Sequence, residues 1–140
     1  MQDKVFFDTN LWIYLFLTSS LKNEDRKKRK LVKTLITNHP NIVVSNQVLN
    51  EISNVLLKKY QIDHSRVEIY LKKLLNIVEL HLLDELNTFD ALTLISQYNL
   101  SFYDALIVSA AIDANCSVLF SEDMQDGLKI EDKLEIVNPF

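Results

Sequence analysis

The sequence predicts an α/β fold in which helices cover a short, mainly parallel sheet. Short apolar runs typical of buried strands alternate along the chain with amphipathic helical patterns, as in parallel βαβ units. Carboxylates lie at or shortly after the ends of several of these runs. In an α/β sheet, ligand-binding and active sites form at the carboxyl ends of the strands. The 140 residues contain no low-complexity stretch or linker, so we expect a single domain over residues 1–140.

Strands are predicted where a few apolar residues stand between polar or turn-forming ones. The first run ends directly on Asp8, Thr9 and Asn10, a carboxylate followed by a hydroxyl and an amide. A later run ends in the same way on Ser121, Glu122 and Asp123. The predicted strands cover residues 4–7, 42–44, 77–80, 117–120 and 134–137.

Helices are predicted where apolar residues recur at intervals of three and four. Ser19 and Ser20 indicate a turn after the first helix, and residues 101–112 are apolar on nearly all faces, which indicates a buried helix. The predicted helices cover residues 11–17, 24–36, 46–60, 65–75, 88–98 and 101–112.

Composition excludes several classes of protein. A formal net charge of −4 disfavours binding to nucleic acid through bulk electrostatics, although it leaves room for a local patch. No apolar stretch approaches the roughly 20 residues of a membrane span, and no basic flank precedes the first apolar run, as it would in a signal peptide. We therefore expect a cytoplasmic protein that does not contact membranes.

The densest basic run lies in the second predicted helix. A solvated helix surface and a contact with a nucleic-acid backbone both account for such a run. The candidate RNA-contact residues are Arg26, Lys27, Arg29 and Lys30.

Two of the acids that follow strands or open helices also have a purely structural interpretation. Asp8 can cap the helix that follows it, since aspartate is a preferred N-cap residue. Asp104 lies three residues after Ser101, which is the spacing of a capping box. Both interpretations are compatible with a functional role.

Four acids are expected to meet at one edge of the sheet: Asp8, Glu51, Asp104 and Asp123. Two like charges 4 Å apart repel by about 4 kcal/mol at an effective dielectric constant of 20, so such a cluster needs protons or a divalent cation. Carboxylates without neighbouring His or Cys suit Mg²⁺ or Mn²⁺, the ions of metal-assisted phosphodiester hydrolysis. The three histidines are scattered, and a single glycine excludes a glycine-rich phosphate loop.

Four segments resemble the PIN-domain family, and in particular its small members such as the VapC-type toxins of toxin–antitoxin pairs. They lie in matching order over nearly the whole chain: Phe7-Asp8-Thr9-Asn10, Ser45-x-x-Val48-x-x-Glu51, Tyr103-Asp104-Ala105-Leu106-Ile107 and Leu119-Phe120-Ser121-Glu122-Asp123-Met124.

The resemblance implies a three-layer α/β/α sandwich with a short, mainly parallel sheet. It also implies an endoribonuclease that depends on Mg²⁺ or Mn²⁺, is often a homodimer and is inhibited by a small antitoxin protein. It implies that Asp8, Glu51, Asp104 and Asp123 are the metal-binding and catalytic acids. Asn10 and Ser121, together with Thr9, would support them. Glu122 and Asp126 flank Asp123 and remain alternatives for the fourth acid.

Three other functions remain compatible with the sequence. The chain could be a catalytically silent module that binds RNA or protein, a housekeeping nuclease that matures RNA, or a phosphatase acting on a small substrate. The first is disfavoured because a silent site has no reason to retain mutually repelling carboxylates.

Overall fold

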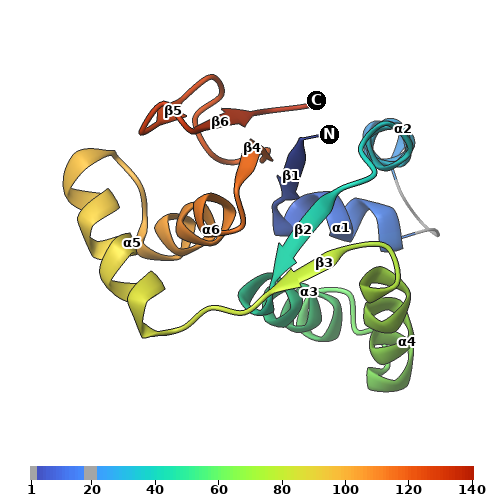
Figure 1. Cartoon of the computed structure of the whole chain (residues 1–140). Coiled ribbons are helices and arrows are strands. Elements are labelled where there is room, and N and C mark those ends of the chain that lie inside the picture. The colour runs from blue at the N-terminus through green and yellow to red at the C-terminus, as the bar shows by residue number, and fades with distance from the viewer. Residues whose placement is uncertain (1–2, 18–21) are drawn as a thin grey trace.

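The computed structural model describes residues 3–17 and 22–140, and the turn predicted at Ser19 and Ser20 lies outside them. Its mixed α/β architecture is the predicted one, with a mainly parallel sheet between helices (Figure 1). The strands are β1 (Lys4–Phe7), β2 (Ile42–Ser45), β3 (Glu79–His81), β4 (Cys116–Phe120), β5 (Lys129–Ile130) and β6 (Leu134–Val137). The helices are α1 (Thr9–Phe16), α2 (Asn23–Asn38), α3 (Asn46–Lys58), α4 (His64–Leu75), α5 (Glu85–Gln97) and α6 (Phe102–Asp113).

The order of the strands explains the three layers. Across the sheet it is β3-β2-β1-β4-β6-β5, and all neighbours are parallel except β5 and β6. From β1 to β3 the chain moves in one direction, and from β3 to β4 it returns past β1. Because such crossovers are right-handed, the reversal puts α5 and α6 on the face opposite α1 to α4. Figure 1 shows α5 and α6 on one side of the sheet and α1, α2 and α4 on the other.

The reversal also creates a switch point between β1 and β4. The two strands pair in parallel, with Phe7 opposite Phe120, so their carboxyl ends lie side by side. The connection after β1 leads towards β2, whereas the connection after β4 leads towards β6. In open α/β sheets, ligands bind at such a point.

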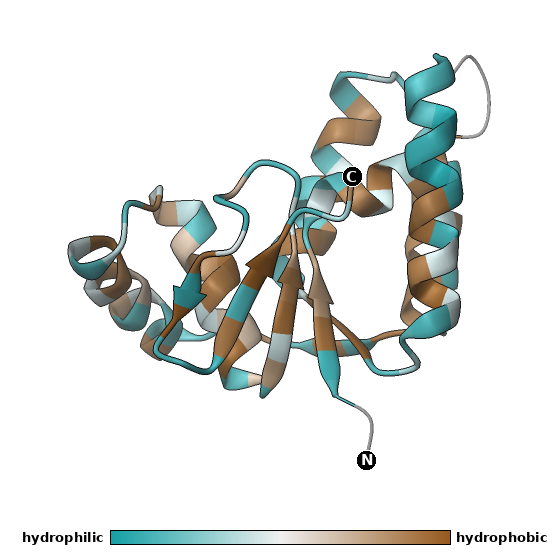
Figure 2. Ribbon diagram, turned by 90° about the horizontal axis from the view of Figure 1, so that it is seen from above, coloured by the Kyte–Doolittle hydropathy of each residue, from teal (hydrophilic) through white to brown (hydrophobic). Residues whose placement is uncertain are grey.

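Aromatic side chains pack together beneath this part of the sheet. Phe7 contacts the rings of Trp12 and Phe120, with centroids 5.1 and 5.6 Å apart. Phe7 and Trp12 are fully buried, and burying each such side chain stabilises the fold by about 1.5–3 kcal/mol or more. The central strands are mostly hydrophobic along their length (Figure 2). Helix α6 is buried from Ala105 to Ala111, as its uniformly apolar sequence predicts.

Several predicted boundaries are wrong at the periphery. Helix α5 begins at Glu85 rather than near residue 88, because Asp84 and Asn87 form a capping box ahead of the apolar pattern. Strand β3 is shifted to Glu79–His81, and the two-residue strand β5 is absent from the prediction. Within the described residues, no helix is both long and apolar enough to cross a bilayer.

Candidate active site

Asp8 lies where β1 ends and α1 begins. Its backbone N–H donates to the carbonyl of Phe120 on β4 at 2.9 Å, which ties the two strand ends together. Its carboxylate accepts one hydrogen bond from the N–H of Thr9 at 2.7 Å and another from the hydroxyl of Ser121 at 2.8 Å. Asp8 is therefore the N-cap of α1, as predicted, and it also lies at the switch point, where its role in a functional site stays a prediction.

Burial changes the acidity of Asp8. The residue is only 7% exposed, and this desolvation is the main cause that raises its pKa from 3.8 to about 6. The hydrogen bonds from Ser121 and Thr9 oppose the rise, and the charges of Glu51 and Asp104 add to it. The side chain is thus an acid whose ionised form is destabilised by burial and by two neighbouring carboxylates.

Glu51 reaches this position from α3 and is held at both oxygens. The hydroxyl of Thr9 donates to Oε2 at 3.2 Å, and Nε2 of Gln47 donates to Oε1 at 2.7 Å. Gln47 also donates to the carbonyl of Tyr103 at 3.2 Å, which links α3 to the start of α6. The sequence analysis did not single out Gln47, although its position four residues before Glu51 puts both on one face of the helix.

Asp104 lies in the first turn of α6. Ser101 is the N-cap, and its hydroxyl accepts from the N–H of Asp104 at 3.2 Å. Among the described residues the Ser101 amide makes no hydrogen bond to this carboxylate, so the predicted capping box is only half formed. Burial raises the pKa of Asp104, and the charge of Asp123 adds to the rise while the Ser101 hydroxyl opposes it. Asp104 is therefore electrostatically coupled to both Asp8 and Asp123.

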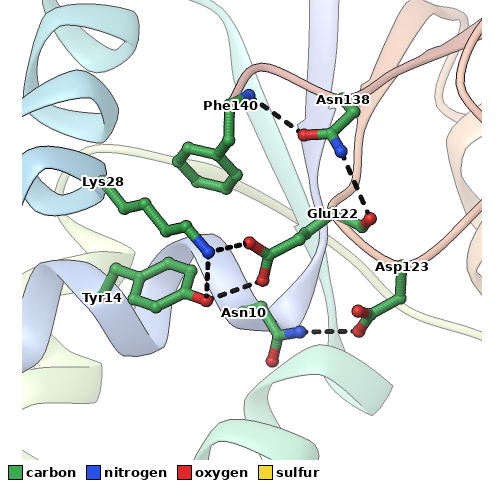
Figure 3. Close-up of polar contacts among 7 residues, drawn as sticks. All are labelled: Asn10, Tyr14, Lys28, Glu122, Asp123, Asn138 and Phe140. Atoms are coloured by element: carbon green, nitrogen blue, oxygen red, sulfur yellow. Dashed lines mark hydrogen bonds and ion pairs between the residues drawn. The ribbon is translucent and has the colours of Figure 1, made fainter. Parts of the chain in front are cut away.

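Asp123 is on the loop after β4, and its two acidic neighbours point elsewhere. Nδ2 of Asn10 donates to the Asp123 carboxylate at 2.6 Å (Figure 3). Glu122 instead binds Lys28 and Tyr14, and Asp126 accepts from the N–H of Asn138 at 2.8 Å. Of the three acids in this loop, Asp123 is the one directed at the end of β1.

Glu122 belongs to a network that joins three elements. Lys28 of α2 forms an ion pair with Glu122, and the hydroxyl of Tyr14 on α1 donates to the same carboxylate at 2.6 Å (Figure 3). The ion pair raises the pKa of Lys28, and burial together with the Glu122 hydrogen bond raises the pKa of Tyr14 to about 12. Lys28 lies within the basic run, between Lys27 and Arg29, but no role was predicted for it, because no sequence signal connects residues 94 positions apart.

The four candidate RNA-contact residues lie on α2 in two environments. Arg26, Lys27 and Lys30 are exposed, as a solvated surface or a nucleic-acid contact requires. Arg29 is half-buried, and its Nε donates to the carbonyl of Leu15 at 3.2 Å, so it joins α2 to α1.

The donor set suits a hard divalent cation. All four acids are carboxylates, and Asp8, Glu51 and Asp123 are oriented by hydrogen bonds from Thr9, Ser121, Gln47 and Asn10. As the side chains stand, no three His, Cys, Asp or Glu residues of the described chain are positioned to ligate one ion. Magnesium commonly binds through one or two carboxylates and several waters, which this arrangement allows.

Comparison with known proteins identifies the architecture. The family model of the PIN domain matches residues 5–126. Comparison with curated proteins gave no match.

Three solved structures share the fold. One is a toxin–antitoxin complex from Klebsiella pneumoniae, with a TM-score of 0.69, 22% identity, and coverage of 97% of this chain and 98% of that one. VapC20 of Mycobacterium tuberculosis, described as a toxin that cleaves the sarcin–ricin loop, has a TM-score of 0.66, 19% identity, and coverage of 85% and 91%. VapBC2 of Rickettsia felis, bound to a promoter DNA fragment, has a TM-score of 0.64, 19% identity, and coverage of 96% and 99%.

Proposed function

Because the chain belongs to the PIN domain family, we propose that it is a divalent-metal-dependent endoribonuclease whose site is formed by Asp8, Glu51, Asp104 and Asp123. We propose that residues 1–140 act as a single nuclease domain, with Mg²⁺ or Mn²⁺ as the cofactor. The observation that carries this proposal is the burial of Asp8 at the switch point beside two further carboxylates, an arrangement that is costly unless a cation binds there.

Each residue has a role in this proposal. Asp8, Glu51, Asp104 and Asp123 would hold the ion. When bound, such an ion supplies Lewis-acid chemistry, activating a water for in-line attack on the phosphodiester and offsetting charge on the leaving oxygen. Thr9, Ser121 and Asn10 would keep the carboxylates in orientation through the hydrogen bonds they donate.

The exposed cations of α2 support an RNA substrate. Of the four candidate RNA-contact residues, Arg29 contacts Leu15, whereas Arg26, Lys27 and Lys30 are exposed on α2. Each phosphate contact with single-stranded RNA contributes about 0.7 to the slope of log affinity against log salt. Replacing these three by Gln should therefore weaken RNA binding and lower that slope.

We further propose that the protein is the toxin of a type II toxin–antitoxin pair in the cytoplasm. Two of the similar structures are toxin–antitoxin complexes, which supports a small antitoxin protein as partner. We also propose a homodimer. Exposed apolar side chains around α5 support a protein contact there: Leu82, Leu86, Phe89 and Leu92.

Cleavage of RNA by the purified, antitoxin-free protein tests the proposal. Structured RNA would be incubated with Mg²⁺, Mn²⁺ or EDTA, beside the Asp8→Asn variant and beside Asp132→Asn, a matched change at an exposed aspartate. We expect cleavage with either metal that EDTA and Asp8→Asn abolish and Asp132→Asn leaves intact. Absence of cleavage by the folded protein would instead favour a silent binding module, and cleavage of small phosphate esters alone would favour a phosphatase.

Expression in cells separates a toxin from a housekeeping nuclease. A toxin should arrest growth when produced alone, and the gene of its antitoxin, supplied together, should restore growth. A housekeeping nuclease should be tolerated without any partner.

A further inference from the structure

A pocket of about 530 Å³ opens beside the candidate site. This volume lies within the range of about 300–1,000 Å³ that is usual for ligand sites. Glu51, one of the four proposed metal ligands, forms part of its wall, and Tyr103 precedes Asp104 directly in the chain. The other lining residues are mainly amides: Asn46, Gln47, Asn50 and Asn54, with Leu83.

The amides form a row on one face of α3. Gln47, Asn50 and Asn54 follow one another at intervals of three and four, so their side chains project from the same side of the helix. Asparagine is a poor helix former compared with Ala, Lys or Glu. Stability of the helix therefore does not explain why this face carries amides.

The row has a fixed end and a free end. Gln47 is held by Glu51 and by the Tyr103 carbonyl, and Oδ1 of Asn46 accepts from the N–H of Leu83 at 3.0 Å. Asn50 and Asn54 are exposed, and their side chains hydrogen-bond to no residue in the part of the chain that the structure describes. Each therefore offers a donor and an acceptor to a ligand.

Tyr103 supplies an aromatic surface at the edge of the same pocket. It is 65% exposed, which leaves its ring accessible to a ligand. Its ring packs edge-on against Phe102, with centroids 5.4 Å apart, so the ring is supported from one side. An exposed ring beside amide groups is the combination with which proteins bind unpaired bases of single-stranded RNA.

The charge of the pocket favours a nucleobase over a phosphate group as its ligand. None of its lining residues is Lys or Arg, and Glu51 is negatively charged when ionised. A phosphate group would be repelled there, whereas a neutral, planar group with donors and acceptors would be bound.

We propose that this pocket binds one unpaired nucleobase of the RNA substrate, stacked on Tyr103 and hydrogen-bonded by Asn50 and Asn54. The inference rests on the proposed ribonuclease function, which it deepens by assigning a base-recognition subsite next to the carboxylates. The base would belong to a nucleotide close to the cleaved phosphodiester, because Glu51 borders both the pocket and the candidate site.

Binding to short RNA tests this inference without relying on cleavage. Fluorescently labelled six-nucleotide single-stranded RNAs, intact or with one abasic position, would be titrated into the Asp8→Asn protein. Adding Tyr103→Ala should weaken binding of intact RNA by roughly tenfold, as removal of one stacking contact does, and should abolish the preference for intact over abasic RNA. Tyr103→Phe should preserve both, as should Tyr60→Ala, which removes another exposed tyrosine outside the pocket.

A double variant of Asn50 and Asn54 provides a second, independent test. Asn50→Ala combined with Asn54→Ala should reduce discrimination among RNAs that differ only in the base at the sensitive position. If Tyr103→Ala fails to fold, the double asparagine variant tests by itself whether the pocket binds a base. Unchanged affinity and unchanged base preference in these variants would overturn the inference and assign the pocket to another partner, such as a protein side chain.

Cleavage assays of the unsubstituted protein and of the pocket variants, all with Asp8 intact, distinguish failure of the base subsite from failure of the proposed ribonuclease function. RNA that is cleaved with the same preference by the Tyr103 and asparagine variants contradicts only the base subsite. RNA that binds in the expected pattern but is never cleaved contradicts only the nuclease. Absence of any RNA binding contradicts both.

Discussion

The ends of β1 and β4 lie side by side, and each carries an acidic side chain in a different way. Asp8, after β1, is 7% exposed and is held by its immediate neighbour Thr9 and by Ser121 across the sheet. Asp123, after β4, is exposed on a loop and is held by Asn10 of α1. The buried carboxylate accepts two hydrogen bonds, from a backbone N–H and a hydroxyl, whereas the exposed one accepts a single hydrogen bond from a side-chain amide.

The difference indicates that Asp8 and Asp123 would contribute in different ways to binding a cation. Asp8 cannot move without breaking the contact between β1 and β4, so it sets the position of the site. Asp123 is exposed, so we expect its side chain to adjust when an ion binds, and we expect the ion pair between Lys28 and Glu122 to restrain its loop. Variants that change the acid at one strand end and leave the other intact test this difference between Asp8 and Asp123.

The largest effect is expected from the fixed carboxylate. Asp8→Asn should lower cleavage by at least about a thousandfold, since metal stabilisation of the transition state contributes several kcal/mol. The metal-free variant should nevertheless be more resistant to unfolding at pH 7.5, because the substitution removes a buried charge. Cleavage rates and thermal melts of this variant and of Asp132→Asn measure both effects, and a destabilised Asp8→Asn protein would argue that capping is the main role of Asp8.

The burial of Asp8 should also make the free energy of unfolding depend on pH. The pKa of Asp8 is raised in the folded protein to about 6 from an ordinary value of 3.8, so the folded state binds the proton more tightly than the unfolded state. The free energy of unfolding should therefore fall as the pH rises from below about 4 to above about 6, by up to about 3 kcal/mol in all at about 1.36 kcal/mol per pKa unit. The raised pKa of Asp104 acts in the same direction.

Urea unfolding of the metal-free protein across this pH range provides the measurement. The Asp8→Asn protein is the control, since the part of the slope due to Asp8 should be missing from it. Identical pH profiles for the two proteins would contradict a raised pKa at Asp8.

Substitution of the exposed carboxylate, Asp123, should give a smaller but selective effect. Asp123→Asn should lower cleavage by about a hundredfold, whereas Asp126→Asn should change it by less than about threefold, because Asp126 is engaged by the Asn138 amide. Initial rates at saturating Mg²⁺ measure the two changes. A larger loss in Asp126→Asn would reassign the fourth acid.

The smallest effect is expected from the network behind Asp123. Lys28→Met should lower cleavage by about tenfold and should raise the Mg²⁺ concentration needed for half-maximal activity, since the loop is then less restrained. Lys28→Arg, which keeps the ion pair, should restore most of the activity. Lys33→Met, a change at an exposed lysine on the same helix, should have no effect on the Mg²⁺ requirement.

Local sequence patterns predicted most of the fold. The strands at 4–7 and 134–137 have the predicted boundaries, because a short apolar run between polar residues defines a buried strand well. The edge of the sheet was predicted less well. Strand β3 is exposed over two of its three residues, and β5 has only two residues, so neither carries a clear apolar pattern.

The candidate site was predictable to the extent that it depends on strand ends. Asp8 and Asp123 follow buried strands, and parallel strands bring such positions together. The roles of Lys28 and Gln47 were not predictable in the same way. Lys28 reaches Glu122 only because α2 packs beside α1 near the end of β4, and Gln47 matters because α6 begins next to α3.

Calorimetry of Mg²⁺ binding near pH 6 tests the central claim most directly. At that pH Asp8 should be about half protonated, so ion binding should release about half a proton from it, measured with buffers of different ionisation heat. The account predicts Mg²⁺ binding with proton release at pH 6, less release at pH 8, and loss of binding in Asp8→Asn. Mg²⁺ binding that is unchanged in Asp8→Asn, or no binding by the unsubstituted protein, would contradict a metal site formed around Asp8.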